Sequence, residues 1–412
     1  MPAAVKPSPG RITIFEGLRA YLAWWVVGYH ILSECGFESR FLPGILRVVG
    51  AAGGEAVRVF IILSGFVITH LLLNKKESYR LFLTRRFFRL YPAFIGAVIL
   101  GAALLPWIVD LYTYLKANPL ATTPRLEDWW MNGADHFWRY LPASVTMLHG
   151  AMPNALLPHA QAAFISPGWS ISLEWQFYLV VPFVLRLASK WPFYTMAGIA
   201  LVVATSDYWP VGEWGSFLPQ RAEYFLLGCV SYLVYRRLPS VRWSGPLPLI
   251  VWTALIWITL SPEWRKMLAG SYEFSIGPWL PVGIWSLALS LAVDHRTSPE
   301  NPRMRGCYWL FNNPVIQALG KISFSTYLYH YFAIFAGLAL FRALGLPANK
   351  YYALAVVAPV TLLLTIAISF LVYHAVEKPG IAWGSHYCRR LQLRLKTPPA
   401  VAGLVLKENA RS

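Results

Sequence analysis

Ten predominantly apolar stretches recur along this chain at fairly even spacing. A helix needs about 20 mainly apolar residues to cross the hydrocarbon core of a bilayer. Within lipid, every backbone polar group must also find a partner inside the segment. The stretches therefore predict an all-α polytopic membrane protein. The predicted spans are residues 12–32, 56–73, 91–109, 169–188, 192–206, 222–235, 247–260, 276–293, 317–341 and 352–373.

The composition also indicates that most of the chain lies in a lipid bilayer. The chain is 57% hydrophobic and 13% charged, whereas a soluble domain has about 25% charged residues. The net charge is +17, and the Lys and Arg residues lie between the apolar stretches and not on one basic domain. This distribution argues against a nucleic-acid partner. The expected partners include membrane lipids, and the expected location is the inner (plasma) membrane, with several crossings.

The Lys and Arg residues predict the orientation of the chain. Alternate loops, including both termini, hold 23 of them, and the intervening loops hold 10. Because positive residues concentrate on the cytoplasmic side, both termini are predicted to be cytoplasmic. The predicted organisation is a cytoplasmic N-terminus (1–11), a transmembrane domain (12–378) and a basic cytoplasmic tail (379–412). The sequence does not indicate the oligomeric state.

One outer loop, residues 110–168, is too long for a simple connection. Loops of this length are usually functional or disordered, and its aromatic content argues against disorder. The loop contains Trp129, Trp130, Trp138, Tyr140, His136, His149 and His159. It is either an interfacial aromatic belt with a surface helix or an aromatic platform for sugar rings.

Two polar residues in the first span are candidates for function. Ionisable groups inside a membrane are expensive and are functional candidates by default. Arg19 and His30 are eleven residues apart, which places them on one face of a helix, about 16 Å apart along its axis. Arg19 could instead extend to the inner headgroups, and His30 could cap the outer end. The shared face favours a polar path lined by both residues.

The next segment pairs small residues with a basic cluster. Ser64 and Gly65 lie in the middle of the second span, where small residues usually permit close helix packing. Arg85, Arg86 and Arg89 follow on the inner side. Such a cluster either binds anionic lipid headgroups or binds the phosphates of a nucleotide cofactor, since guanidinium groups bind phosphate through two hydrogen bonds.

Three further polar residues fall within or beside later spans. Glu174 lies near the outer end of its span, at the depth inferred for His30. It is predicted to pair with that histidine and raise its basicity. For His330 and Glu377, structural hydrogen bonding and function remain equal alternatives. No metal is expected, because the four cysteines have no metal-ligand spacing.

Several motifs together resemble the acyltransferase-3 family of integral membrane O-acyltransferases. Arg19 and His30 match the family's Arg and His separated by ten residues, and FIILSGFVIT at 60–69 matches its next helix. The other matches are R-R-x-x-R at Arg85, Arg86 and Arg89, WSISLEWQFY at 169–178, SFSTYLYHY at 323–331 and Val376–Pro379. In 169–178 this chain has one additional residue, so either Ser170 or Ser172 could correspond to the family's serine.

The resemblance implies transfer of an acyl group, usually acetyl, from cytoplasmic acyl-CoA to a hydroxyl of a carbohydrate or glycolipid, such as a surface polysaccharide. It implies His30, Glu174 and Arg19 as catalytic residues and Arg85, Arg86 and Arg89 as donor-binding residues. It adds Ser64, Gly65, His330 and Glu377 as motif residues.

Two other classes compete with this interpretation. A transporter or flippase with an intramembrane polar pathway would also carry buried Arg, His and Glu. The unrelated membrane-bound O-acyltransferases also use an intramembrane histidine, but the spacing of Arg19 and His30 argues against them. Metalloprotease, P-loop and serine-esterase motifs are absent from the sequence.

Overall fold

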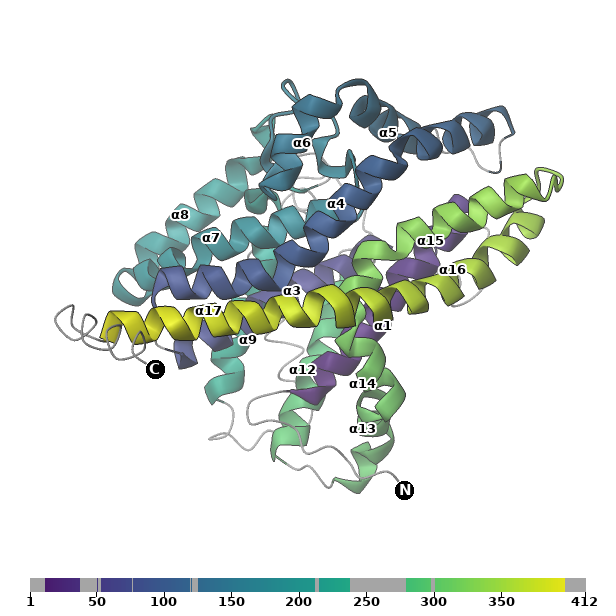
Figure 1. Ribbon diagram of the computed structural model, residues 1–412. Coiled ribbons are helices and arrows are strands. Elements are labelled where there is room, and N and C mark those ends of the chain that lie inside the picture. The colour runs from purple at the N-terminus through teal and green to yellow at the C-terminus, as the bar shows by residue number, and fades with distance from the viewer. Residues whose placement is uncertain are drawn as a thin grey trace, which may run out of the picture.

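A computed structural model describes most of the chain (Figure 1). The described residues are 12–37, 50, 53–75, 77–118, 120, 125–211, 215–237, 279–297 and 301–396. Within these ranges every regular element is a helix, and the only β-type pairing is an isolated bridge between Pro153 and Val211.

Five of the described helices are long and apolar enough to cross a membrane. They are Gly53–Asn74, Tyr79–Ala117, Gly168–Lys190, Ser323–Ala343 and Lys350–Leu393. The predicted all-α membrane class is therefore confirmed. The number of ten crossings and the cytoplasmic position of both termini stay predictions, and the predicted span 247–260 lies outside the described residues.

Most predicted spans coincide with single helices to within a few residues. These helices are α1 (Thr13–Glu34), α3 (Gly53–Asn74), α7 (Gly168–Lys190), α8 (Pro192–Thr205), α9 (Ala222–Arg237), α12 (Trp279–Thr297) and α16 (Lys350–Val372). The agreement arises because lipid exposure leaves the backbone no alternative to continuous helix within an apolar stretch.

Two predicted spans differ from the observed helices. The span 91–109 is the middle of a longer helix, α4 (Tyr79–Ala117), which also contains the basic cluster. The span 317–341 is divided at Ile322 into α14 (Pro314–Lys321) and α15 (Ser323–Ala343). The division accompanies a close approach of α14 to α1, where a Cβ on Gly320 would lie 2.2 Å from the carbonyl oxygen of Glu16.

Helix α1 is the centre of the bundle. It packs against α3, α12, α14, α15, α16 and the short helix α13 (Arg305–Asn312). After α16, a π-helical segment (Tyr373–Glu377) leads into α17 (Lys378–Lys396), which packs along α4. Figure 1 shows α16 and α17 as one long, nearly continuous yellow helix that crosses the molecule. The first part of the predicted cytoplasmic tail is thus a helix packed on the bundle.

The long loop between α4 and α7 folds into a compact cap. It contains α5 (Arg125–Asp135), α6 (Phe137–Val145) and two short 3-10 turns, and it lies at the top of the view in Figure 1. Trp130 and Tyr140 are each only 1% exposed, whereas Trp138 is 80% exposed. Stacking against a sugar needs an open ring face, so these two buried rings cannot supply the aromatic platform that was one of the two alternatives. Trp130 instead packs edge-on against Phe335 of α15, and the Tyr140 hydroxyl donates to the carbonyl oxygen of Pro158.

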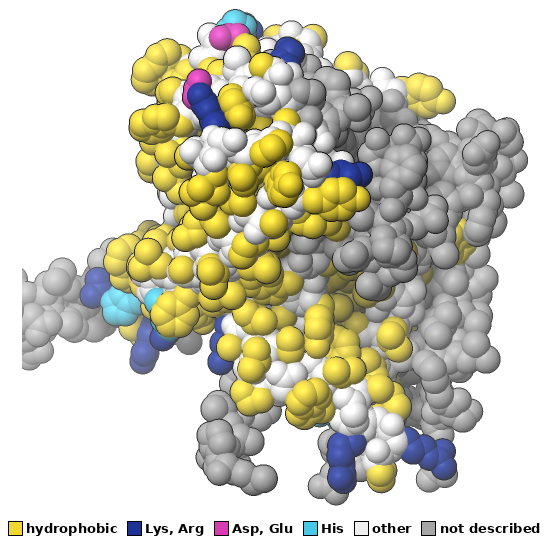
Figure 2. Space-filling view, turned by 90° about the vertical axis from the view of Figure 1, so that its right-hand side faces the viewer, with side chains coloured by type: hydrophobic (Ala, Val, Ile, Leu, Met, Phe, Trp, Pro, Cys, Tyr) yellow, Lys and Arg dark blue, Asp and Glu magenta, His cyan; other side chains and the backbone are white. Residues whose placement is uncertain are grey.

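The outer surface has the character expected of a lipid-facing protein. Phe193 of α8 and Leu363 of α16 are among many exposed large apolar side chains. Figure 2 shows a broad hydrophobic surface over the middle of one face, with Lys and Arg side chains above and below it. In water such a surface would be an aggregation hazard, whereas in a bilayer it is the required exterior.

Candidate active site

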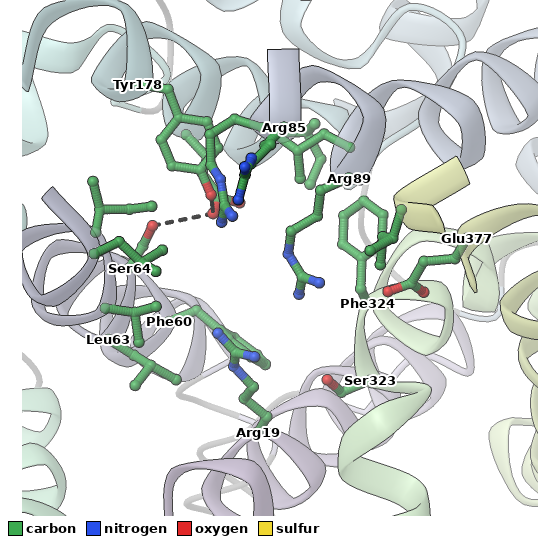
Figure 3. A pocket seen from close by; sticks show the side chains of 18 of the residues that line it. Arg19, Phe60, Leu63, Ser64, Arg85, Arg89, Tyr178, Ser323, Phe324 and Glu377 are labelled. Carbon is green, nitrogen blue, oxygen red and sulfur yellow. Dashed lines mark hydrogen bonds between the residues drawn. The ribbon is translucent and has the colours of Figure 1, made fainter. Parts of the chain in front are cut away.

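A cavity of about 540 Å³ lies among α1, α3, α4, α7 and α15, beside the π-helical segment before α17 (Figure 3). Six cationic and four acidic side chains line it. The cations are Arg19, Lys75, Arg85, Arg86, Arg89 and Lys321, and the acids are Glu16, Glu77, Glu174 and Glu377. The cationic excess inside low-dielectric walls concentrates a positive potential, which attracts anions.

The three arginines of the basic cluster are held by one rigid helix. Because α4 begins at Tyr79, Arg85, Arg86 and Arg89 lie in its first turns, and all three line the cavity. Arg85 forms an ion pair with Glu77 at 3.0 Å. The sequence-predicted donor-binding residues are thus brought together, although one is already neutralised by an acidic neighbour.

Arg19 completes the basic wall from the opposite side. Figure 3 shows Arg19 of α1 and Arg89 of α4 pointing toward each other across the cavity. Within the described part of the chain, neither guanidinium has a hydrogen-bonded or ion-paired partner. Glu377 acts electrostatically on Arg89, and Glu16 and Glu174 act on Arg19, but the cavity still holds more cations than acids. Since a buried charge needs compensation, this excess indicates a site for an anionic ligand.

Glu174 belongs to this cavity and not to the surroundings of His30. Its carboxylate accepts hydrogen bonds from Ser64 of α3, at 3.0 Å, and from Tyr178 one turn along α7. The predicted pair of Glu174 and His30 is therefore wrong. Depth within a span can be read from sequence, but the direction in which α7 faces is set by its packing on α3 and α4.

The position of Ser64 depends on the glycine beside it. A Cβ on Gly65 would lie 2.2 Å from the carbonyl oxygen of Phe225 in α9, so only glycine permits this approach. With Gly65 against α9, Ser64 faces the cavity. The predicted packing role of small residues is confirmed for Gly65.

His30 lies in a second polar cluster, formed by α1 and α15. Its Nδ1 is 2.8 Å from the hydroxyl of Tyr331, and its ring centroid is 5.2 Å from that of His330. His30 is not among the residues that line the basic cavity. Helix α1 therefore presents Arg19 to the cavity and His30 to α15.

His330 and Glu377 have separate environments. His330 is fully buried, with Nδ1 2.7 Å from the carbonyl oxygen of Tyr327 and with no partner for Nε2 among the described residues. The carboxylate of Glu377 accepts a hydrogen bond from Ser325 at 2.9 Å and lines the basic cavity. It ends the π-helical segment, a deviation often found at functional sites.

Several polar residues near the two clusters were missed by the sequence analysis. Tyr178 holds Glu174, and Tyr327 shares a 2.8 Å hydrogen bond with Ser170 at the cavity wall. Glu34 lies one turn after His30 and is buried. Its signal was present, since a carboxylate at the end of an apolar span needs a partner. Among the described residues no group of three or more His, Cys, Asp or Glu could hold a metal ion.

A third histidine anchors the start of α7. His149 of the cap stacks on Phe94 of α4 and has Nε2 3.0 Å from the carbonyl oxygen of Gly168, the first residue of α7. Burial lowers the pKa of His149 to about 4, because the charged imidazolium would lose its hydration, and the hydrogen bond to Gly168 opposes this only in part. His149 is therefore a neutral structural donor at physiological pH.

Comparison with known protein families gives a match over most of the chain. The family described as an acyltransferase domain, acyltransferase-3, matches residues 12–374. The chain belongs to the acyltransferase-3 family. The match runs from the start of α1 into the π-helical segment, so it includes the cluster around His30 and every charged residue of the basic cavity except Glu377.

Individual relatives of this acyltransferase-3 protein are distant. It is 26% identical over 353 residues to the acyltransferase MdmB of Streptomyces mycarofaciens, covering 80% of this chain and 81% of the relative. Over 201 residues it is 27% identical to the peptidoglycan O-acetyltransferase OatA of Listeria monocytogenes, covering 46% of this chain and 27% of the relative. It spans 59% of a Staphylococcus aureus protein of the O-acetyltransferase group at 24% identity. No solved structure matches the chain.

Proposed function

We propose that this membrane acyltransferase moves an acyl group, in the first instance acetyl, from cytoplasmic acyl-CoA to a hydroxyl of a carbohydrate or glycolipid at the outer face of the inner (plasma) membrane. The observation that supports the proposal most is one cavity lined by Arg19, Arg85, Arg86 and Arg89. Among the described residues, Arg19 and Arg89 have neither a hydrogen-bonded nor an ion-paired partner. A donor with several phosphates supplies the negative charge that this cavity lacks.

The size and position of the cavity favour this donor. Its volume of about 540 Å³ is within the usual range of about 300–1,000 Å³ for ligand sites. Arg85, Arg86 and Arg89 follow a segment rich in Lys and Arg, which the positive-inside rule assigns to the cytoplasm. Acyl-CoA is made in that compartment.

His30 is the group we assign to the chemical step. It lies about 16 Å from Arg19 along α1. If the arginines bind the donor phosphates, the extended arm of the donor can reach from the cavity toward His30. As a base, His30 takes the proton of the acceptor hydroxyl while the new C–O bond forms. The C–S bond of the thioester then breaks, and the same proton goes to the departing thiolate. His30 could alternatively carry the acyl group transiently.

Glu174 and Arg19 act on the donor side in this scheme. Arg19 binds donor phosphate, and Glu174 balances the arginine charge while the cavity is empty. Tyr178 and Ser64 hold the Glu174 carboxylate in place. The name of the Listeria relative, a peptidoglycan O-acetyltransferase, supports a carbohydrate as the acceptor class.

The second candidate is a transporter or flippase, favoured by the charged groups inside the bundle. Radiolabelled acetyl-CoA and a panel of cell-surface glycans, added to the protein in lipid nanodiscs, distinguish the two. The proposal expects an alkali-labile ester on the acceptor. An acceptor that crosses the bilayer chemically unchanged would overturn it.

The donor site is tested separately by direct binding. Arg89→Gln should weaken acyl-CoA binding about 10- to 100-fold, the value of one charge-assisted hydrogen bond. The matched control is Arg305→Gln, because Arg305 is exposed and lies outside the cavity. Equal affinities of these two variants would show that the cavity is not the donor site.

A further inference from the structure

A buried carboxylate, Glu34, lies one helical turn beyond His30 on α1 and is 8% exposed. Two tyrosine hydroxyls donate to it, Tyr112 of α4 at 3.1 Å and Tyr331 of α15 at 3.4 Å. The Tyr331 hydroxyl is also 2.8 Å from Nδ1 of His30. Tyr331 therefore bridges the histidine and the carboxylate.

The single proton of the Tyr331 hydroxyl determines the direction of both contacts. With Glu34 in its ionised form, its carboxylate only accepts hydrogen bonds, and the hydroxyl proton of Tyr331 then lies toward Glu34. The Tyr331 oxygen is then left as an acceptor for His30. In a neutral imidazole one nitrogen carries the proton and the other is the acceptor. The geometry therefore places the His30 proton on Nδ1 and leaves Nε2 as the free base.

No other described group around His30 provides this orientation. Tyr29 contacts the imidazole through its ring, at a centroid distance of 4.8 Å, and His330 lies at 5.2 Å. Neither makes a hydrogen bond to His30 in the described structure. Glu174, the acid first expected to serve His30, is occupied by Ser64 and Tyr178.

We propose that Glu34 and Tyr331 are positioning residues that hold His30 in the Nδ1-protonated tautomer, with Nε2 directed to the acceptor hydroxyl. This inference rests on the proposed function of His30. When Nε2 takes the hydroxyl proton, His30 becomes a cation, and the negative charge of Glu34 stabilises it through Tyr331. When Nε2 returns the proton to the departing thiolate, His30 is neutral again, and neither Glu34 nor Tyr331 has changed its protonation.

The hydrogen-bonded series Glu34–Tyr331–His30 is called the relay below. The direct test is replacement of Tyr331 and of Glu34. Tyr331→Phe should lower kcat about 10- to 100-fold, as losses of an orienting partner commonly do, with the KM for acyl-CoA unchanged. Glu34→Gln should be worse, because an amide can donate to Tyr331, turn its hydroxyl toward His30 and favour the wrong tautomer. The matched control is Tyr29→Phe, which keeps its ring on His30 and should retain wild-type kcat.

A spectroscopic measurement separates positioning from simple loss of packing. In protein with ¹⁵N-labelled histidine, the His30 signals are identified by their loss in His30→Ala. The wild type should show a protonated Nδ1 and an unprotonated Nε2, and Glu34→Gln should shift the population toward Nε2–H. A wild type with its proton on Nε2 would overturn the relay, even if Glu34→Gln failed to fold.

Failure of the relay and failure of the proposed function give different results. If His30→Ala still transfers acyl groups, His30 is not the base and the proposed function is wrong at its central residue. If His30→Ala is inactive but Tyr331→Phe and Glu34→Gln match Tyr29→Phe, only the relay is wrong.

Discussion

The carboxylate of Glu174 accepts a 3.0 Å hydrogen bond from the hydroxyl of Ser64, which joins α7 to α3 at the wall of the arginine-lined cavity. The Glu174 carboxylate thus offsets part of the arginine charge. His30 instead contacts the Tyr331 hydroxyl, which also contacts Glu34. The sequence suggested that Glu174 alone would serve His30, whereas in the structure Glu174 lies beside the arginines and Glu34 lies beside His30.

The first prediction concerns the charge of Glu174. In Glu174→Gln the amide oxygen can still accept from Ser64 and Tyr178, but the negative charge that repels donor phosphates is gone. Binding of coenzyme A should tighten about three- to tenfold at low ionic strength and converge with wild type at high salt. Isothermal titration in nanodiscs measures this.

The matched control for that change is Ser64→Ala, which removes the hydrogen bond and leaves the charge in place. Its affinity for coenzyme A should stay within about twofold of wild type, since no cavity charge changes. Unchanged or weaker binding by Glu174→Gln would contradict an electrostatic role of the carboxylate.

The second prediction separates Arg19 from His30. His30→Ala should reduce acyl transfer by at least about 10²-fold, the lower value for loss of a general base, and saturating acyl-CoA should not restore it. Arg19→Ala should lose activity mainly through a raised KM, so a high donor concentration should restore part of it. Initial rates over a range of acyl-CoA concentrations distinguish the two.

An insertion tests the geometry of α1 directly. One alanine inserted between Arg19 and His30 rotates the histidine about 100° relative to the arginine and should remove it from Tyr331. The insertion variant should be as inactive as His30→Ala at normal membrane abundance. Robust transfer by either protein would rule out the assigned base.

The third prediction uses two glycines of α3. Gly65→Ala places a Cβ 2.2 Å from the carbonyl oxygen of Phe225, so α3 and α9 must separate. Such overpacking typically costs about 1–3 kcal/mol, and the midpoint of thermal unfolding in detergent should fall.

Gly54 is the control for this substitution, because a Cβ there meets nothing within 4 Å. Gly54→Ala should be neutral or stabilise the protein by about 0.5–1 kcal/mol, since alanine favours helix over glycine. Equal unfolding midpoints for the two variants would show that the close contact of α3 and α9 does not limit stability.

The fourth prediction concerns pH and the cap. The folded-state pKa of His149, about 4, is below the ordinary histidine value of 6.5, so the unfolded chain binds a proton that the folded chain excludes. This contribution to stability is fully present above pH 6.5 and is lost as the pH falls toward 4. Between pH 7 and 5 the loss should be about 2 kcal/mol, at about 1.4 kcal/mol per pH unit below 6.5.

The comparison is made with His149→Gln, which keeps a donor for the Gly168 carbonyl and has no proton to gain. The free energy of unfolding of wild type should decline more steeply with acid than that of the variant. Parallel curves for the two proteins would show that His149 is accessible to protons in the folded state.

The sequence alone determined the class of this protein and most of its helices. Apolar length decides whether a segment can cross a membrane, and an apolar stretch in lipid can only be a helix. The same logic marked Arg19, His30 and Glu174 as unusual, because a charged or ionisable group in such a stretch is costly wherever it faces. Arg85, Arg86 and Arg89 were marked by their clustering on the inner side of a span.

Only the tertiary structure decided which of these residues meet. Spacing along one helix orders Arg19 and His30, but it does not determine what α7 or α15 presents to them. Gly65 lets α3 approach α9 and leaves Ser64 to hold Glu174 at the cavity. Tyr331 reaches His30 from 301 residues away along the chain. Such pairings depend on the rotation of one packed helix against another, which the hydrophobic pattern of a fully apolar span does not specify.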